Sequence, residues 1–111
     1  MNAIVVLTTV GSREQGDAIA RELVGRRRAA CVNMIPGITS VYRWQGEICR
    51  DSEVLLVIKT MAEDYESVAA TIREIHEYDV PEILAFNVER GDASYLDWVA
   101  ASLDKKAPDV D

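Results

Sequence analysis

The chain has 111 residues, of which 49% are hydrophobic and 28% charged, a composition typical of a soluble globular domain. Its formal net charge of −7 argues against general binding to nucleic acid or to an anionic membrane surface, because both depend on basic residues. The apolar runs are too short to span a bilayer, so we expect neither nucleic acid nor a membrane as a partner.

An apolar run over residues 3–9 predicts a buried β-strand close to the N-terminus. Ser12 and Gln15 then have the spacing of a helix capping box, and apolar residues recur with a helical period as far as Gly25. Three arginines at 26–28 follow the helix. We interpret them as a solvated helix end, and an anion site is the alternative.

Two long strand-like runs come next, over residues 30–44 and 47–58. Pro36-Gly37 interrupts the first run and predicts a bulge, because proline cannot donate to a sheet ladder. Gln45-Gly46 separates the two runs and predicts a tight hairpin turn.

A second capping-box spacing, Thr60 with Glu63, predicts that another helix begins at this point. Its apolar residues keep a helical period as far as His76. We therefore expect this helix to present one continuous apolar stripe with the histidine at its end.

The last elements are shorter. Residues 82–88 predict a fourth strand, and Asp92 is expected to cap a final helix that reaches Leu103. The residues that follow are polar, so we expect one ferredoxin-like domain over 1–103 and a polar C-terminal tail over 104–111.

This order, β-α-β-β-α-β plus a C-terminal helix, predicts an α+β fold of the ferredoxin-like type. Right-handed crossovers would place both main helices on one face of a four-stranded antiparallel sheet and leave the other face open. The strand after the hairpin is apolar on both sides, with Leu56 and Ile58 on one and Leu55 and Val57 on the other. A bare apolar face favours association, so we expect the chain to pack against copies of itself.

Few residues suggest chemistry by themselves. His76 is the only histidine, and it could be a packed residue at a helix end or a metal ligand with Glu77 or Glu82 nearby. Cys31 could be a small apolar filler, or a soft ligand that would suit copper or zinc together with imidazole. The sequence leaves these alternatives open.

Aromatic residues gather near the hairpin. Tyr42, Trp44 and Tyr78 could line a cleft, although aromatic residues at a hairpin tip are more often interface anchors. Lys59 ends an apolar strand on the same face as Glu53. The two could form an ordinary ion pair, or the lysine could be a buried charge in a cleft between subunits.

Signatures of an enzyme are missing from the sequence. It contains neither a glycine-rich phosphate loop nor a nucleophile elbow, so we expect no catalytic activity. The two cysteines lack a metal-finger spacing, and no secretory signal is visible. We expect a cytoplasmic location, where a disulfide is uncommon.

Six groups of residues, specific in combination, extend over nearly the whole chain. They read ACVN at 30–33, SVYRWQGEI at 40–48, Glu53, Lys59-Thr60, HEYDVPEI at 76–83 and YLDW at 95–98. Together they resemble the CutA family of divalent-cation tolerance proteins. The resemblance implies a cytoplasmic ferredoxin-like homotrimer, similar in architecture to the PII signalling proteins, that takes part in tolerance of divalent metals such as copper.

The resemblance also implies site residues. Cys31 and His76 match positions proposed for metal binding, and Glu82 is our third candidate ligand. We expect Cu²⁺ or another divalent cation as the ligand, with no cofactor required for folding. Four further residues match positions expected around the inter-subunit cleft: Tyr42, Trp44, Lys59 and Tyr78.

Two points stay open at this stage. The alternative function is that of a PII-like signalling protein that binds a small molecule in the inter-subunit cleft and acts on an unknown protein partner. The chain also departs from the family pattern, because Glu77 stands where the family usually has proline after the histidine. We expect a less rigid loop there.

Overall fold

Buried and more exposed side chains alternate along the central strands, because every second side chain of a strand points to the helix layer. The computed structural model describes residues 2–103. Its helices and strands are β1 (Ala3–Val10), α1 (Arg13–Gly25), β2 (Cys31–Trp44), β3 (Glu47–Met61), α2 (Tyr65–Ile75), β4 (Leu84–Asn87) and α3 (Ala93–Ala101).

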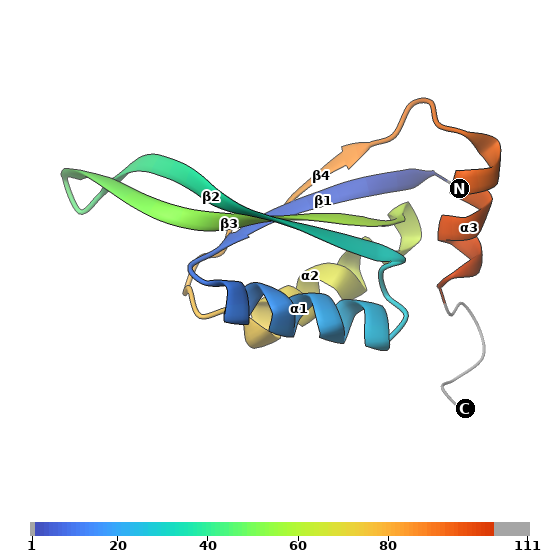
Figure 1. Ribbon diagram of the computed structural model, residues 1–111, viewed down its shortest axis with the longest axis horizontal. Helices are drawn as coiled ribbons and strands as arrows, with labels where there is room; N and C mark the ends of the chain where they lie inside the picture. Colours follow the sequence, from blue (N-terminus) through green and yellow to red (C-terminus); the bar gives the residue numbers. More distant parts are fainter. Residues whose placement is uncertain (1, 104–111) are drawn as a thin grey trace.

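The four strands form one sheet in the order β2-β3-β1-β4, and every neighbouring pair is antiparallel. Helices α1 and α2 cover one face of this sheet, while α3 lies beside the end of the sheet near the N-terminus (Figure 1). This arrangement confirms the predicted ferredoxin-like α+β fold. No helix in the stretch from residue 2 to residue 103 is long and apolar enough to cross a membrane.

The core lies between the sheet and the two covering helices. Its fully buried members are contributed by β1, β3, α1 and α2 and include Val6, Val10, Ile19, Leu23, Leu56, Ile58, Val68 and Ile72. Burial of these apolar side chains is the main term that holds the helix layer on the sheet.

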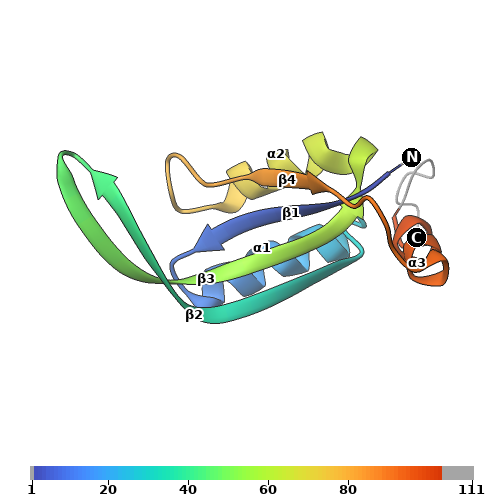
Figure 2. The ribbon, with the colours of Figure 1, turned by 90° about the horizontal axis from the view of Figure 1, so that it is seen from above.

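The opposite face of the sheet is open among the described residues, as Figure 2 shows from above. Strand register places three rows of side chains on this face: Phe86, Val5, Lys59 and Cys31; Leu84, Leu7, Val57 and Asn33; and Thr9, Leu55 and Ile35. Leu84 and Phe86, on the edge strand β4, are 50% and 53% exposed. The predicted uncovered apolar face is therefore present in one chain.

The hairpin of β2 and β3 extends beyond the helix layer (Figures 1 and 2). The register shifts between Ile35 and Ile38, which confirms the bulge predicted at Pro36-Gly37, and Gly37 has a φ of +79° there. Gln45 and Gly46 both have positive φ, at 51° and 81°, as a tight primed turn requires. We call residues 38–53, the hairpin beyond the bulge, the arm.

The predicted capping box at Thr60 is wrong. Strand β3 continues to Met61 because Ile4 and Ala3 of β1 pair with its last residues. The Thr60 hydroxyl donates to the Arg28 carbonyl oxygen at 2.7 Å instead of capping a helix. A 3₁₀ turn (Ala62–Asp64) then leads into α2, and no side chain caps it. Sheet pairing outweighed the local signal.

The other predicted boundaries hold with small changes. Ser12 Oγ accepts a hydrogen bond from the Gln15 backbone N–H at 3.1 Å, which confirms the first helix cap. Asp92 likewise accepts from the Tyr95 N–H and caps α3. Strand β4 is shorter than residues 82–88, because only four of its residues pair with β1. The predicted tail, 104–111, lies outside the described residues.

The arginine cluster after α1 is only partly a solvated helix end. Arg26 bonds Glu22 within its own helix and reaches Glu74 of α2 at 3.3 Å. Arg28 donates to the Thr71 hydroxyl at 2.6 Å. These contacts tie α1 to α2, and they occupy Arg26 and Arg28 with structural partners.

Candidate functional site

A cluster of polar side chains lies where the arm leaves the sheet. The Glu53 carboxylate accepts hydrogen bonds from the Ser40 hydroxyl at 2.7 Å and from the Tyr78 hydroxyl at 2.6 Å. Further along the arm, the Tyr42 hydroxyl donates to Asp51. We call these five residues the arm-root cluster. Both acidic side chains in it accept from a tyrosine.

Strand register explains two of these contacts. Ser40 lies directly opposite Asp51, so Glu53 is its diagonal neighbour two residues further on. Tyr42 lies opposite Cys49 and has Asp51 as its diagonal neighbour in the same way. Diagonal side chains on one face of an antiparallel pair are within reach of long residues. Tyr78 comes from outside the hairpin, from the segment between α2 and β4.

Both tyrosines of the cluster have a raised pKa. The hydrogen bond to Asp51, with some burial, raises the pKa of Tyr42 to about 12. Burial raises the pKa of Tyr78 further, and its hydrogen bond to Glu53 adds to the effect. Both hydroxyl groups therefore remain hydrogen-bond donors at neutral pH.

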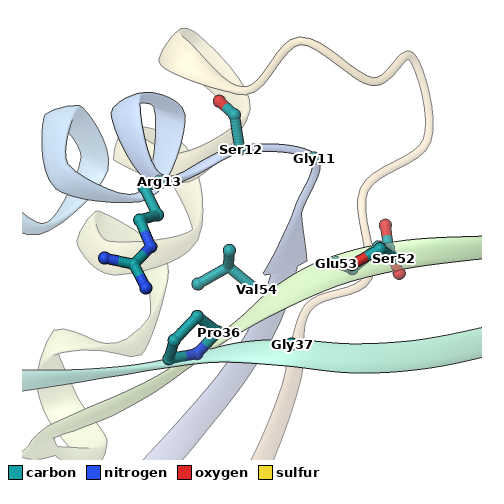
Figure 3. A pocket seen from close by; sticks show the side chains of 8 residues that line it. All are labelled: Gly11, Ser12, Arg13, Pro36, Gly37, Ser52, Glu53 and Val54. Carbon is teal, nitrogen blue, oxygen red and sulfur yellow. The ribbon is translucent and has the colours of Figure 1, made fainter.

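An open hollow of about 450 Å³ adjoins the cluster (Figure 3). The start of α1, the bulge of β2 and the adjoining part of β3 line it with Gly11, Ser12, Arg13, Pro36, Gly37, Ser52, Glu53 and Val54. The Arg13 side chain extends from α1 toward Pro36 (Figure 3), and Glu53 is among the residues of β3 that line the hollow. The lining of the hollow thus includes one cationic and one anionic residue.

His76 is buried at the end of α2, and both of its ring nitrogens are engaged. Nδ1 accepts from the Tyr78 backbone N–H at 3.1 Å, and Nε2 lies 2.8 Å from the Thr9 carbonyl oxygen. A carbonyl oxygen only accepts, so the ring proton is on Nε2. In this arrangement the imidazole has no free lone pair for a metal ion.

Cys31 lies near the opposite end of the sheet. Its Sγ is 4.0 Å from the Lys59 Nζ. Cys31 aligns with Lys59 and Val5, whereas Thr9, the partner of His76, lies four residues further along β1. Four residues of a strand span about 13 Å. Within one chain, Cys31 and His76 are therefore not parts of one site.

Glu82 is exposed in the segment between α2 and β4. Between residues 2 and 103, no group of three or more His, Cys, Asp or Glu side chains could hold a metal ion. The candidate ligands Cys31, His76 and Glu82 thus do not fit a metal centre within one chain. A bound metal ion is coordinated by several ligand atoms that lie close together.

The four cleft candidates separate into three regions. Tyr42 and Tyr78 both belong to the arm-root cluster, while Trp44 is 58% exposed beside the turn at the tip of the arm. Lys59 lies on the open sheet face and donates to the Asn33 side-chain oxygen. The alternative Lys59–Glu53 ion pair is wrong, because each side chain has a different partner.

Sequence reasoning missed Ser40 and Asp51 and assigned Glu53 another partner. The signal was available in the turn, because a two-residue hairpin at Gln45-Gly46 fixes the register and hence the diagonal neighbours. The contact from Tyr78 had no such signal. It joins residues 25 positions apart through the packing of the segment after α2.

The comparisons with known proteins agree with this fold. The CutA1 divalent ion tolerance protein family matches residues 4–102. A Thermus thermophilus divalent-cation tolerance protein CutA is 47% identical over 95 residues, which cover 86% of this chain and 92% of the relative. The chloroplastic CutA of Arabidopsis thaliana is 45% identical over 90% of this chain, which spans only 55% of that protein.

Solved structures are similar as well. CutA1 from Oryza sativa has a TM-score of 0.93 at 39% identity and covers 96% of this chain and 97% of its own. The Thermus thermophilus divalent cation tolerance protein has a TM-score of 0.89 at 44% identity, with 92% and 99% covered. The chain therefore belongs to the CutA1 divalent ion tolerance protein family.

Proposed function

We propose that this protein acts in divalent-cation tolerance as a homotrimer without catalytic turnover, and that it holds its ligand between subunits. The family match over residues 4–102 supports the tolerance role. The observation that carries the assembly is the open sheet face, which exposes Leu84 and Phe86 beside Val5 and Leu7. An apolar surface of this kind on a soluble protein marks an interaction site.

A second copy is the occupant that best suits this face. The arm extends beyond the helix layer and carries exposed apolar residues, with Val41 60% and Ile48 71% exposed. Strand β2 forms an edge of the sheet and presents unpaired backbone groups. A closed ring of three copies would cover both features. Light scattering at micromolar concentration should give three times 12.3 kDa, and a stable 12.3 kDa particle would refute the trimer.

Divalent cations, copper among them, are the proposed ligands, held by donors from different copies. Cys31 on the open face and exposed Glu82 are the accessible candidates, whereas His76 would first have to give up a backbone hydrogen bond. Equilibrium dialysis with Cu²⁺, Cu⁺ and Zn²⁺ tests this, using Cys31→Ala and Glu82→Gln beside the unaltered trimer. Affinities that stay unchanged in both variants would remove these two residues as ligands.

The absence of turnover is part of the same proposal. Both ring nitrogens of the single histidine are bonded to backbone groups, so it has no free nitrogen for proton transfer. The carboxylates of the arm-root cluster accept from hydroxyl groups that remain protonated at neutral pH. We propose a cytoplasmic location as well, supported by the free thiols of Cys31 and Cys49.

A second candidate function is that of a PII-like regulator that binds a small molecule. The hollow of about 450 Å³ at the root of the arm favours it, because Arg13 and Glu53 offer both charges to a polar guest. A thermal-shift screen that includes nucleotides and amino acids tests this idea. A ligand that stabilises the unaltered protein but not Arg13→Ala would support it, and no stabilisation by any compound would count against it.

A further inference from the structure

The hydrogen bonds of His76 join two parts of the chain that are far apart in sequence. Nε2 donates to Thr9 at the end of β1, and Nδ1 accepts from the backbone of Tyr78, two residues after the histidine. The neutral ring with its proton on Nε2 satisfies both partners at once. His76 therefore fixes the beginning of the α2–β4 segment, residues 76–83, to the sheet.

Two more contacts hold the same segment. The Glu77 N–H donates to the Gln15 side-chain oxygen of α1 at 2.6 Å. The rings of His76 and Tyr78 pack with their centroids 4.6 Å apart. Backbone and side chain of Tyr78 are thus both positioned through His76, and Gln15 adds a second fixed point.

The Tyr78 side chain carries this position to the arm. Its hydroxyl donates to Glu53 at 2.6 Å, in a charge-assisted bond that is stronger than a neutral one. Gly11 leaves space for it, since a Cβ atom on Gly11 would lie 3.3 Å from the hydroxyl oxygen. The loop before α1 therefore accommodates this tyrosine.

The contact between Tyr78 and Glu53 lies where it can set the direction of the arm. Glu53 pairs with Ile38, the first pair beyond the bulge. The register shift and the positive φ of Gly37 mark the place where the hairpin departs from the regular sheet. A bond at the first pair beyond a bend holds the arm at its root.

We propose that His76 is a positioning residue that sets the direction of the arm through Tyr78 and Glu53, rather than a metal ligand. The contacts lie within one chain, so the proposal does not depend on the trimer or on any bound cation. It also accounts for the lack of a metal-binding group around His76 in the described part of the chain.

Hydrogen exchange of the arm amides, read by mass spectrometry, tests the proposal. Tyr78→Phe removes only the hydroxyl, and amides of residues 38–53 should then exchange about tenfold faster, as expected for one lost hydrogen bond to a charged group. His76→Ala should act in the same way. The matched control is Tyr95→Phe, which alters an exposed tyrosine on α3 and should leave the arm unchanged.

Conservative variants separate positioning from loss of stability. His76→Asn keeps an acceptor near the Nδ1 position for the Tyr78 N–H, so it should loosen the arm less than His76→Ala does. The double variant His76→Ala with Tyr78→Phe should exchange no faster in the arm than either single variant, because both act on one path. If the two substitutions instead lowered the stability of the whole fold independently, their effects on exchange would add in the double variant. Exchange would then also become faster in α1, as much as in the arm.

Two results would overturn the proposal. One is arm exchange that stays unchanged in Tyr78→Phe, a variant that keeps the imidazole and the ring packing. The other is loss of Cu²⁺ binding in His76→Asn while Tyr78→Phe binds normally, which would assign His76 as a ligand. Light scattering on every variant ensures that samples of the same oligomeric state are compared.

Discussion

Buried polar atoms decide much of the local stability, and two threonines on neighbouring strands show how. Thr8 and Thr60 are both fully buried on the helix side of the sheet. The Thr60 hydroxyl has a carbonyl partner, whereas Thr8 Oγ1 has none within residues 2–103. A buried hydroxyl without a partner costs free energy that an apolar group of the same shape would not.

We predict that Thr8→Val stabilises the protein by about 1 kcal/mol, because it replaces the unpaired hydroxyl with a methyl group of equal size. Thr60→Val is the matched control and should lower the free energy of unfolding by about 1–2 kcal/mol, since it leaves the Arg28 carbonyl without its donor. Urea unfolding at fixed protein concentration measures both. A loss of stability in Thr8→Val would contradict the assignment.

Proline can be introduced at position 77, where the resemblance leads us to expect it. Glu77→Pro removes the N–H that Gln15 accepts, and an unpaired oxygen on this buried glutamine should cost about 1–3 kcal/mol. Proline returns only about 0.4–1 kcal/mol by stiffening the unfolded chain. His76 has a ψ of 140°, which suits a following proline. We therefore expect a net loss, by urea unfolding, of about 1 kcal/mol.

Glu77→Ala is the control for this substitution, because it keeps the backbone N–H and removes only an exposed carboxylate. It should unfold close to the unaltered protein. Higher stability in Glu77→Pro would show that the hydrogen bond to Gln15 contributes less than the rigidity of proline. That result would support the expectation that the loop at Glu77 is less rigid, and it would contradict the weight that we give to the hydrogen bond.

At the scale of elements, the arm is a two-stranded hairpin with no helix behind it, so its turn and its cross-strand contacts carry more weight than in the sheet. Gly46 has a φ of +81°, and a Cβ there would meet no atom within 4 Å. Any cost of adding a methyl group is therefore backbone strain alone.

We predict that Gly46→Ala destabilises the hairpin by about 1 kcal/mol, the usual penalty of a left-handed backbone for an L-residue. Gly25→Ala is the control: it also meets no atom within 4 Å, but it ends α1 without a positive φ and should be neutral or slightly stabilising. Thermal unfolding and arm hydrogen exchange report the difference. Equal behaviour of the two variants would contradict the role of the turn.

Alkaline pH should weaken the arm. The pKa of Tyr42 is raised to about 12 by its bond to Asp51, whereas an unfolded tyrosine titrates near 10. Its contribution is fully present below pH 10 and is lost as the pH rises toward 12, because the folded state then holds more protons than the unfolded state. Urea unfolding measures the free energy of unfolding across this pH range. Its decrease between pH 10 and 12 should be smaller in Tyr42→Phe and unchanged in Tyr95→Phe.

Tyr78 contributes to the same window, since its pKa is raised as well, mainly by burial. Tyr42→Phe should therefore reduce the alkaline loss without abolishing it. Absorbance of ionised tyrosine gives an independent reading. Complete titration of all tyrosines near pH 10 in the folded protein would contradict the hydrogen bonds at the arm root.

At the scale of the whole molecule, the open sheet face is the apolar surface that the described residues of one chain do not cover. Phe86 lies on this face opposite Val5, and Val24 on α1, in the helix layer, is similarly exposed, at 44%. The two residues lie on different surfaces of the molecule, but both are apolar and about half exposed. They allow the proposed interface to be tested without altering the core.

We predict that Phe86→Asp dissociates the proposed trimer to monomers, because a charge on this face would be buried without a partner at the proposed interface. Val24→Asp should leave the assembly unchanged. Light scattering across a dilution series measures both. An intact trimer in Phe86→Asp, or dissociation in Val24→Asp alone, would place the interface elsewhere.

The order of elements, the bulge at Pro36-Gly37, the primed turn and the ferredoxin-like fold could all be predicted from the sequence. Each follows from short-range chemistry: proline lacks a donor, glycine accepts positive φ, and apolar periods differ between strand and helix. The two-sided apolar strand likewise predicted the open face. Such features depend on residues and their close neighbours in the chain.

Only the tertiary structure decided the roles of Thr60, His76 and Glu53. Pairing with β1 drew Thr60 into a strand, and packing after α2 brought His76 to Thr9 and Tyr78 to Glu53. These partners lie 25 or more positions apart, and no local pattern encodes such a distance. Within one chain the fold thus places Cys31 and His76 apart, because packing of the core sets where each strand and helix lies.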